Sequence, residues 1–220
     1  MVTFYEEISQ SHQEWIKQQK LFFVATAPLT GKGHVNVSPK GYDAFRILSS
    51  RQVCYLDLTG SGVETISHVK ENGRLTFMFS AFDGPPRIIR LWTTAVVHER
   101  GSPEYEALAE REFPELRGHK SPRSVIVGDV HRVGQSCGFG VPLYEFKEQR
   151  STLLDWAKNT CMEDYWVDKN SFSLDGLPGK GAAASSSYAT WWRQSVPFVT
   201  GFAAGMAVAV AAVKVVGARR

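Results

Sequence analysis

The chain has 220 residues, 43% hydrophobic and 21% charged, which suits one globular domain with a full core and a small appendage. This composition excludes a collagen-like chain, a disordered chain and a protein with several membrane spans. The formal net charge is +3, but residues 176–220 hold five basic residues and no acidic one, which leaves 20 basic and 22 acidic residues in the rest. A nucleic-acid-binding face needs clustered Lys and Arg, so no nucleic acid partner is expected.

The spacing of apolar residues predicts a mainly β domain with flanking helices. In chain order, we expect a helix over 4–19, strands over 21–27, 34–38 and 52–58, a helix over 63–72, strands over 75–80 and 88–98, a helix over 104–111, a strand over 124–133 and a helix over 151–159. Most links between strands are too short for helical crossovers. The pattern therefore indicates a closed or half-closed barrel rather than a doubly wound parallel sheet.

Capping signals mark several helix ends. Thr3 and Glu6 have capping-box spacing at the start of the first predicted helix. Gly73 is placed to end the second helix, and Ser102 before a proline is typical of the start of the third. These signals set the predicted boundaries.

The carboxyl-terminal part differs in composition from the rest. The globular domain is expected to cover residues 1–175, because residues 176–190 are small and polar like a flexible linker. Residues 191–220 contain an uncharged stretch close to the ~20 residues that a bilayer span requires. We expect a hydrophobic helix that anchors the chain in a membrane through residues 197–216, with the barrel in the cytosol, at a mitochondrial or peroxisomal membrane. The alternative is an Ala-rich helix packed on the barrel or on a partner.

No motif of a hydrolase or metalloenzyme assembles. The six histidines show no His-x-His, HExxH or paired His/Cys spacing, so no metal site is expected, and the residues give no catalytic assignment. The glycine turns lack the context of a dinucleotide fingerprint. Three cysteines without CxxC spacing predict free thiols, and Cys137 is expected to be a small buried one.

A glycine turn before a helix is the main candidate for a phosphate site. Thr59, Gly60 and Ser61 follow the third predicted strand, and Ser61 has capping-box spacing with Glu64. Amides at such a helix start favour anions, although an ordinary capped helix gives the same pattern.

Three cationic residues could contribute to the same site. Lys40 places a cation and Ser38 a hydroxyl at the exit of the second strand, where a solvated turn lysine is the commoner explanation. Arg87 and Arg90 stand three residues apart at the start of a strand, so they lie on opposite faces. Only one of the two arginines can point into a given pocket.

Several segments together resemble the pyridoxamine 5'-phosphate oxidase-like proteins with an FMN-binding split barrel, in a fungal and microbial branch. The segments that carry the resemblance are residues 22–27, 34–41, 55–65, 82–90, 136–142, 165–166 and 175–179. The resemblance implies a split β-barrel and a homodimer with FMN at the subunit interface. It also implies a phosphate held by Ser38, Lys40, the loop Thr59 to Ser61 and the following helix with Thr65, and Arg87 or Arg90 near a phosphate or ring oxygen.

Three departures from the family's vitamin B6 oxidases change the expected activity. Asn36 stands four residues before Lys40 where those enzymes have Arg, and the loop has lost its positive charge. Their carboxyl-terminal Arg-x-His element has no counterpart. We therefore expect an FMN-dependent oxidoreductase acting on another small-molecule substrate. The alternative is a barrel that binds a flavin, deazaflavin or haem without catalysis, or a scaffold.

Overall fold

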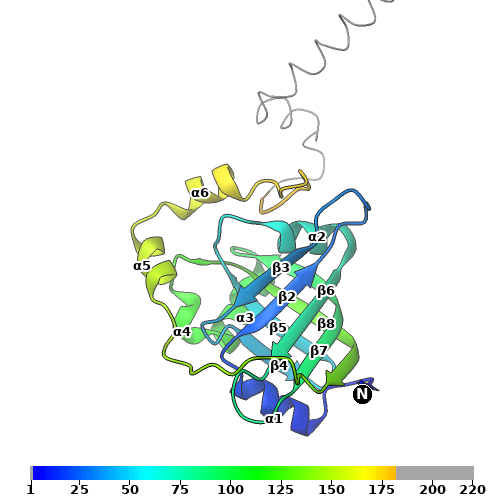
Figure 1. The fold of residues 1–220 in the computed structure, drawn as a ribbon. Helices are drawn as coiled ribbons and strands as arrows, with labels where there is room; N and C mark the ends of the chain where they lie inside the picture. Colours follow the sequence, from blue (N-terminus) through cyan, green and yellow to red (C-terminus); the bar gives the residue numbers. More distant parts are fainter. Residues whose placement is uncertain (1, 182–220) are drawn as a thin grey trace, which may run out of the picture. The chain divides into compact units, whose positions relative to one another are not determined.

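A computed structural model describes residues 2–181, which form an antiparallel sheet curled into a barrel with helices around it (Figure 1). The strands are β1 (Thr3–Tyr5), β2 (Phe22–Thr26), β3 (Asn36–Lys40), β4 (Phe45–Ser49), β5 (Gln52–Leu58), β6 (Arg74–Ser80), β7 (Ile88–Glu99) and β8 (Pro122–Ser136). The helices are α1 (Gln10–Gln18), α2 (Glu64–Asn72), α3 (Pro103–Glu112), α4 (Pro114–Arg117), α5 (Thr152–Lys158) and α6 (Met162–Lys169). The sheet runs in the order β3-β2-β6-β7-β8-β5-β4, and β1 pairs with β8. The expected fold of antiparallel strands with flanking helices is confirmed.

The amino terminus differs from the prediction of one helix over 4–19. Thr3 begins β1, which pairs with β8, and α1 starts only after Ser9, whose hydroxyl accepts a hydrogen bond from the His12 amide at 3.2 Å. Phe4 packs against Trp92 of β7, with ring centroids 6.2 Å apart. Contacts with the sheet therefore outweigh the local capping-box pattern at Thr3 and Glu6.

Three further elements were not predicted. The strand β4 pairs with β5. A turn in which Tyr42 and Asp43 both have positive φ precedes β4. The short helices α4 and α6 have few buried residues and hence weak periodicity. The second strand of the first hairpin also lies two residues later than expected, at Asn36–Lys40 instead of 34–38.

The core has two clusters: the first fills the inside of the barrel, and the second lies against the outer face of β5. Aromatic rings dominate the interior. The ring centroids of Phe22, Tyr55 and Phe77 lie within 6.4 Å of one another. On the other side, the second cluster packs Leu56 of β5 against Tyr105 of α3. Because both sides of β5 are covered, five consecutive residues of this strand, Val53 to Asp57, are buried.

The three described cysteines are free, as predicted. Burial, the main cause, raises the pKa of Cys54 to about 12. Cys137 is exposed, so the expectation that it is a buried thiol is wrong. Its neighbour Gly138 has φ +67°, and this turn leads the chain out of β8 onto the surface.

Residues 162–181, here called the closing segment, pack back onto the barrel. Lys70 of α2 donates to the Gly179 carbonyl at 2.6 Å, and the Gly181 amide donates to Glu99 at 3.0 Å. Residues 176–181, which the sequence assigned to a linker, thus contact the body of the domain.

None of the helices within residues 2–181 is long and apolar enough to cross a membrane. The rest of the expected linker lies outside the described residues. So do the hydrophobic helix over 191–220 and its membrane span at 197–216.

Candidate functional site

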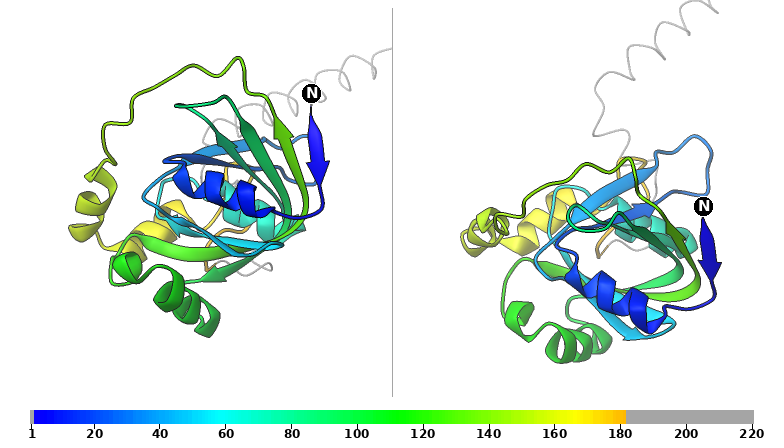
Figure 2. Two further views of the ribbon diagram at one scale, coloured as in Figure 1. Left: turned by 90° about the horizontal axis from the view of Figure 1, so that it is seen from below. Right: turned by 60° about the horizontal axis from the view of Figure 1, so that its bottom comes forward.

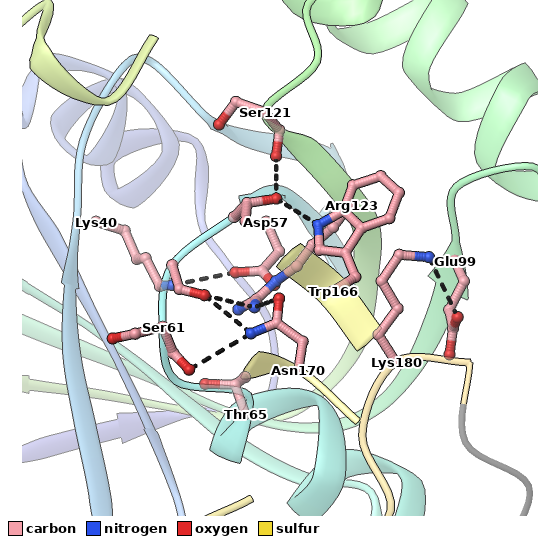
Figure 3. Close-up of polar contacts among 12 residues, drawn as sticks. Lys40, Asp57, Ser61, Thr65, Glu99, Ser121, Arg123, Trp166, Asn170 and Lys180 are labelled. Atoms are coloured by element: carbon pink, nitrogen blue, oxygen red, sulfur yellow. Dashed lines mark hydrogen bonds and ion pairs between the residues drawn. The ribbon is translucent and has the colours of Figure 1, made fainter. Parts of the chain in front are cut away.

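The predicted phosphate loop, Thr59 to Ser61, leads from β5 to α2 and is held from two sides (Figure 3). On the barrel side, the completely buried Thr59 hydroxyl donates to the Ser121 carbonyl at 2.6 Å. The Thr59 amide donates to the same carbonyl at 2.8 Å. These two bonds fix the start of the loop against β8.

The closing segment holds the loop from the outside. The Trp166 indole donates to the Thr59 hydroxyl oxygen at 2.9 Å, and the Asn170 amide group donates to the Gly60 carbonyl at 2.9 Å. Asn170 is completely buried. The conformation of the loop therefore depends on residues more than 100 positions away in sequence.

A buried ion-pair triad lies beneath the loop. Asp57 accepts from Lys40 Nζ at 3.1 Å and from Arg123 Nε at 2.8 Å, and the Asp57 and Arg123 side chains are 0% and 4% exposed. Arg123 also donates to the Asn170 side-chain oxygen at 2.8 Å. Burial alone would raise the pKa of Asp57, but Arg123 and then Lys40 outweigh it and hold this pKa below its usual range. Two cations and one carboxylate leave one net positive charge, and Lys40, 21% exposed, is the cation nearer to solvent.

Hydroxyl groups lie on the same side of β3 as Lys40. Asn36, Ser38 and Lys40 alternate with the exposed residues of this strand and share one face. Ser38 donates to the Asn36 oxygen at 3.0 Å, and the Asn36 nitrogen donates to the Thr65 hydroxyl oxygen at 3.0 Å. Thr65 is itself buried, 5% exposed, and its hydroxyl lies beside that of Tyr55.

The start of α2 carries no side-chain cap. Val63 is the N-cap residue and makes no capping bond, so the predicted capping box of Ser61 and Glu64 is wrong. Glu64 instead accepts from the Leu174 amide in the closing segment at 3.2 Å. Within residues 2–181 the exposed Ser61 hydroxyl has no partner, and the first amides of α2 are not capped by a side chain.

Lys40, Ser38, Ser61, Thr65 and the start of α2 together are called the strand-exit site from here on. Figure 3 shows Lys40 beside the loop that ends with Ser61, with Thr65 at the helix start below them. The site combines one cation, hydroxyl donors and free helix amides, which is the donor set that binds phosphate.

Arg87 and Arg90 do not join this site within one chain. Arg87 lies over the Trp15 ring of α1 at 5.6 Å, and Arg90 contacts Ser136 of β8 at 3.4 Å. Ser38 and Lys40 pair with the buried Val24 and Phe22 on the inner face of the sheet, whereas Arg90 lies on the outer face with Trp92. That Arg87 or Arg90 lies near a phosphate or ring oxygen of a cofactor at a subunit interface stays a prediction.

Three residues that support the loop of the strand-exit site were not predicted from the sequence. Asp57 had a usable signal, because an ionisable residue within the buried run Tyr-Leu-Asp-Leu requires a charged partner. Arg123 and Asn170 had none, since their partners come from distant elements.

The chain matches a known family of proteins. The sequence pattern of the family described as Pyridoxamine 5'-phosphate oxidase matches residues 8–137, and the chain belongs to this family. Among curated relatives, the chain is similar to the pyridoxamine 5'-phosphate oxidase family protein ustO of Aspergillus flavus, with 41% identity over 214 residues, which cover 87% of this chain and 84% of ustO.

Solved structures show weaker similarity. A variant of HupZ from Group A Streptococcus is 25% identical, covers 59% of this chain and 99% of its own, and superposes with a TM-score of 0.47. The FAD binding protein of Mycobacterium smegmatis is 15% identical, covers 60% of this chain and 97% of its own, and has a TM-score of 0.40. The assignment to the family therefore rests on the sequence matches.

Proposed function

We propose that the strand-exit site binds the phosphate of FMN and that the chain is an FMN-dependent oxidoreductase acting on a small-molecule substrate. The observation that carries this proposal is the convergence of Lys40, Ser61 and Thr65 on a helix start without a side-chain cap. Membership of the family supports a flavin as the bound group.

The protein's own residues would hold and orient the cofactor. Lys40 has two N–H groups beyond the one given to Asp57, and the exposed Ser61 hydroxyl can donate its proton. The amides and dipole at the start of α2 add partial positive charge where the phosphate would lie. FMN itself supplies hydride or electron transfer, so no acid-base pair is needed in the loop.

A second candidate function is ligand binding without catalysis, or a scaffold. Asp57 favours it, because this carboxylate already pairs with both cations near the loop and leaves only one net positive charge for a phosphate dianion. A deazaflavin or haem are the alternative ligands under this candidate.

Comparison of FMN with riboflavin tests the phosphate site directly. A charge-assisted hydrogen bond contributes ~1.5–3 kcal/mol, so the full-length protein should bind FMN at least ~10-fold more tightly than riboflavin in fluorescence titrations. Lys40→Ala should bring the two affinities close together, while Lys32→Ala, an exposed lysine in the β2–β3 turn, should leave their ratio unchanged.

The other possible outcomes of the FMN and riboflavin titrations contradict the phosphate site or favour the second candidate function. Equal affinities in the wild type, or a ratio that survives Lys40→Ala, contradict the phosphate site. Absence of binding to both flavins favours the scaffold candidate. Thermal melts of the variants exclude loss of folding as the cause.

We further propose that the chain is a homodimer through the outer face of the β3-β2-β6-β7 sheet. This face carries Val35, Val37 and Phe4, which are 73%, 60% and 52% exposed, around the half-buried Trp92. Val37→Glu should lower the mass measured by light scattering toward that of a monomer, whereas Val167→Glu, 75% exposed on α6, serves as the matched control. A monomeric wild type would refute this proposal.

Membrane attachment through residues 197–216 is also a proposal, with the barrel in the cytosol at a mitochondrial or peroxisomal membrane. It is supported by the uncharged stretch in the sequence. Val208→Lys with Val210→Lys should weaken insertion, since a Lys at the centre of a span costs about 2.5–3.5 kcal/mol. The full-length protein should resist carbonate extraction from membranes, and the double variant should be released. Recovery of the wild type in the extracted fraction would rule the anchor out.

A further inference from the structure

Two adjoining cavities of about 260 and 390 Å³ lie at the α1 end of the barrel. They share the lining residues Lys17, Gln19, Lys20 and Asp43. We propose that these cavities form one binding site, the α1-end site, for an aromatic carboxylate. This proposal does not rest on the proposed flavin function.

The floor of the α1-end site is aromatic and already in place. Phe22 and Phe79 line it and are 5% and 2% exposed, with ring centroids 5.8 Å apart. Phe45, half-buried, lies with its ring 4.9 Å from that of Phe79 in an edge-to-face arrangement. Ile16 and Ile47 complete the walls. A pocket lined in this way favours a planar apolar body.

The mouth of the α1-end site is positively charged. Lys17 and Lys20 are exposed there, and neither has a carboxylate partner among residues 2–181. The single acidic residue of the mouth, Asp43, pairs with Arg46 at 3.2 Å. An anionic group attached to the apolar body would therefore meet two lysines without a carboxylate partner, of which Lys20 lies over the Phe146 ring at 5.9 Å.

Charge also limits where the anion can lie. A third cavity, of about 430 Å³, adjoins at Gln19 and Lys20. Its lining adds three carboxylates, Asp83, Glu145 and Glu148, and one further lysine, Lys147. These carboxylates disfavour an anion in the third cavity. The carboxylate of the ligand is accordingly assigned to the mouth that the first two cavities share.

The rim of the α1-end site is held in a fixed conformation. The coil that follows β8 crosses this end of the barrel (Figure 2), and its Gln149 accepts from the Tyr42 amide at 3.2 Å and donates to the Lys20 carbonyl at 3.1 Å. A Cβ at Gly41 would lie only 2.7 Å from the Gln149 oxygen. Tyr42 and Asp43 keep φ values of +66° and +55°, a strained conformation that often marks functional rims.

Tyr55 separates the α1-end site from the strand-exit site. Its ring lies 5.9 Å from that of Phe22, and Lys40 Nζ lies 5.8 Å from the Tyr55 ring centroid. The two sites thus use different cations, and each can be altered without the other.

Calorimetric titration of the full-length protein with 2-naphthoate tests the inference. Binding should weaken at least tenfold in Lys17→Glu with Lys20→Glu and disappear in Ile47→Trp, which fills the cavity. The neutral 2-naphthalenemethanol should bind the wild type and the charge variant alike. Lys32→Glu is the matched control for added negative charge.

The site would be refuted if the wild type bound no naphthoate, or if the charge variant bound it as the wild type does. Lys40→Ala should leave naphthoate binding unchanged while it reduces the preference for FMN. A loss of naphthoate binding in Lys40→Ala would place the ligand in the strand-exit site and overturn the inference. Failure of the flavin proposal alone would leave the naphthoate results intact.

Discussion

Replacement of Arg123 by Ala should lower the free energy of unfolding by ~3–5 kcal/mol, as is typical when one partner of a buried ion pair is removed. The Arg123 side chain is 4% exposed and donates to both Asp57 and Asn170 at 2.8 Å. In the variant, the completely buried Asp57 keeps Lys40 alone as its partner. Equilibrium unfolding in urea measures the change.

Arg51→Ala is the matched control for removal of a guanidinium group. Arg51 is 58% exposed and lies 3.6 Å from Glu6 and Glu7, so its loss should cost at most ~1 kcal/mol. An equal loss in the two variants would mean that the triad beneath the loop does not contribute the free energy of unfolding expected of it.

Gly179→Ala should destabilise the protein by ~1–3 kcal/mol through overpacking. A Cβ at this position would overlap the Asn170 carbonyl oxygen and approach two methyl carbons of Val63 at 2.9 Å. Because Asn170 holds the Gly60 carbonyl, the substitution should also speed hydrogen exchange in the loop Thr59 to Ser61.

Gly118→Ala controls for the general effect of replacing a glycine. Gly118 has φ −75°, and a Cβ there meets nothing within 4 Å. The free energy of unfolding of this variant should therefore stay within ~0.5 kcal/mol of the wild type. Unchanged exchange in the loop of the Gly179 variant would mean that the closing segment does not hold it.

Elements with strong local signals could be predicted from the sequence. The bounds of β5 agree with the predicted strand over 52–58 because a continuous apolar run ends at a glycine loop. Gly73 ends α2 with φ +72°, and Ser102 caps α3 by accepting from the Tyr105 amide at 3.2 Å. In each case the residues within one turn determine the structure.

Contacts between distant residues could not be predicted in this way. Local spacing favoured capping boxes at Thr3 and at Ser61, but Thr3 pairs with β8 and Glu64 bonds to the closing segment. The triad joins Asp57 to Arg123, 66 residues apart, and no pattern in one sequence shows that pairing. The predicted site residues of β3 and the loop come together, while Arg87 contacts Trp15 and Arg90 contacts Ser136.

The ultraviolet-visible spectrum of the purified full-length protein, with the released cofactor identified by mass, tests most directly whether the strand-exit site holds the phosphate of a flavin. We expect flavin absorbance and the mass of FMN. A colourless protein whose spectrum also stays unchanged on titration with FMN would contradict this expectation.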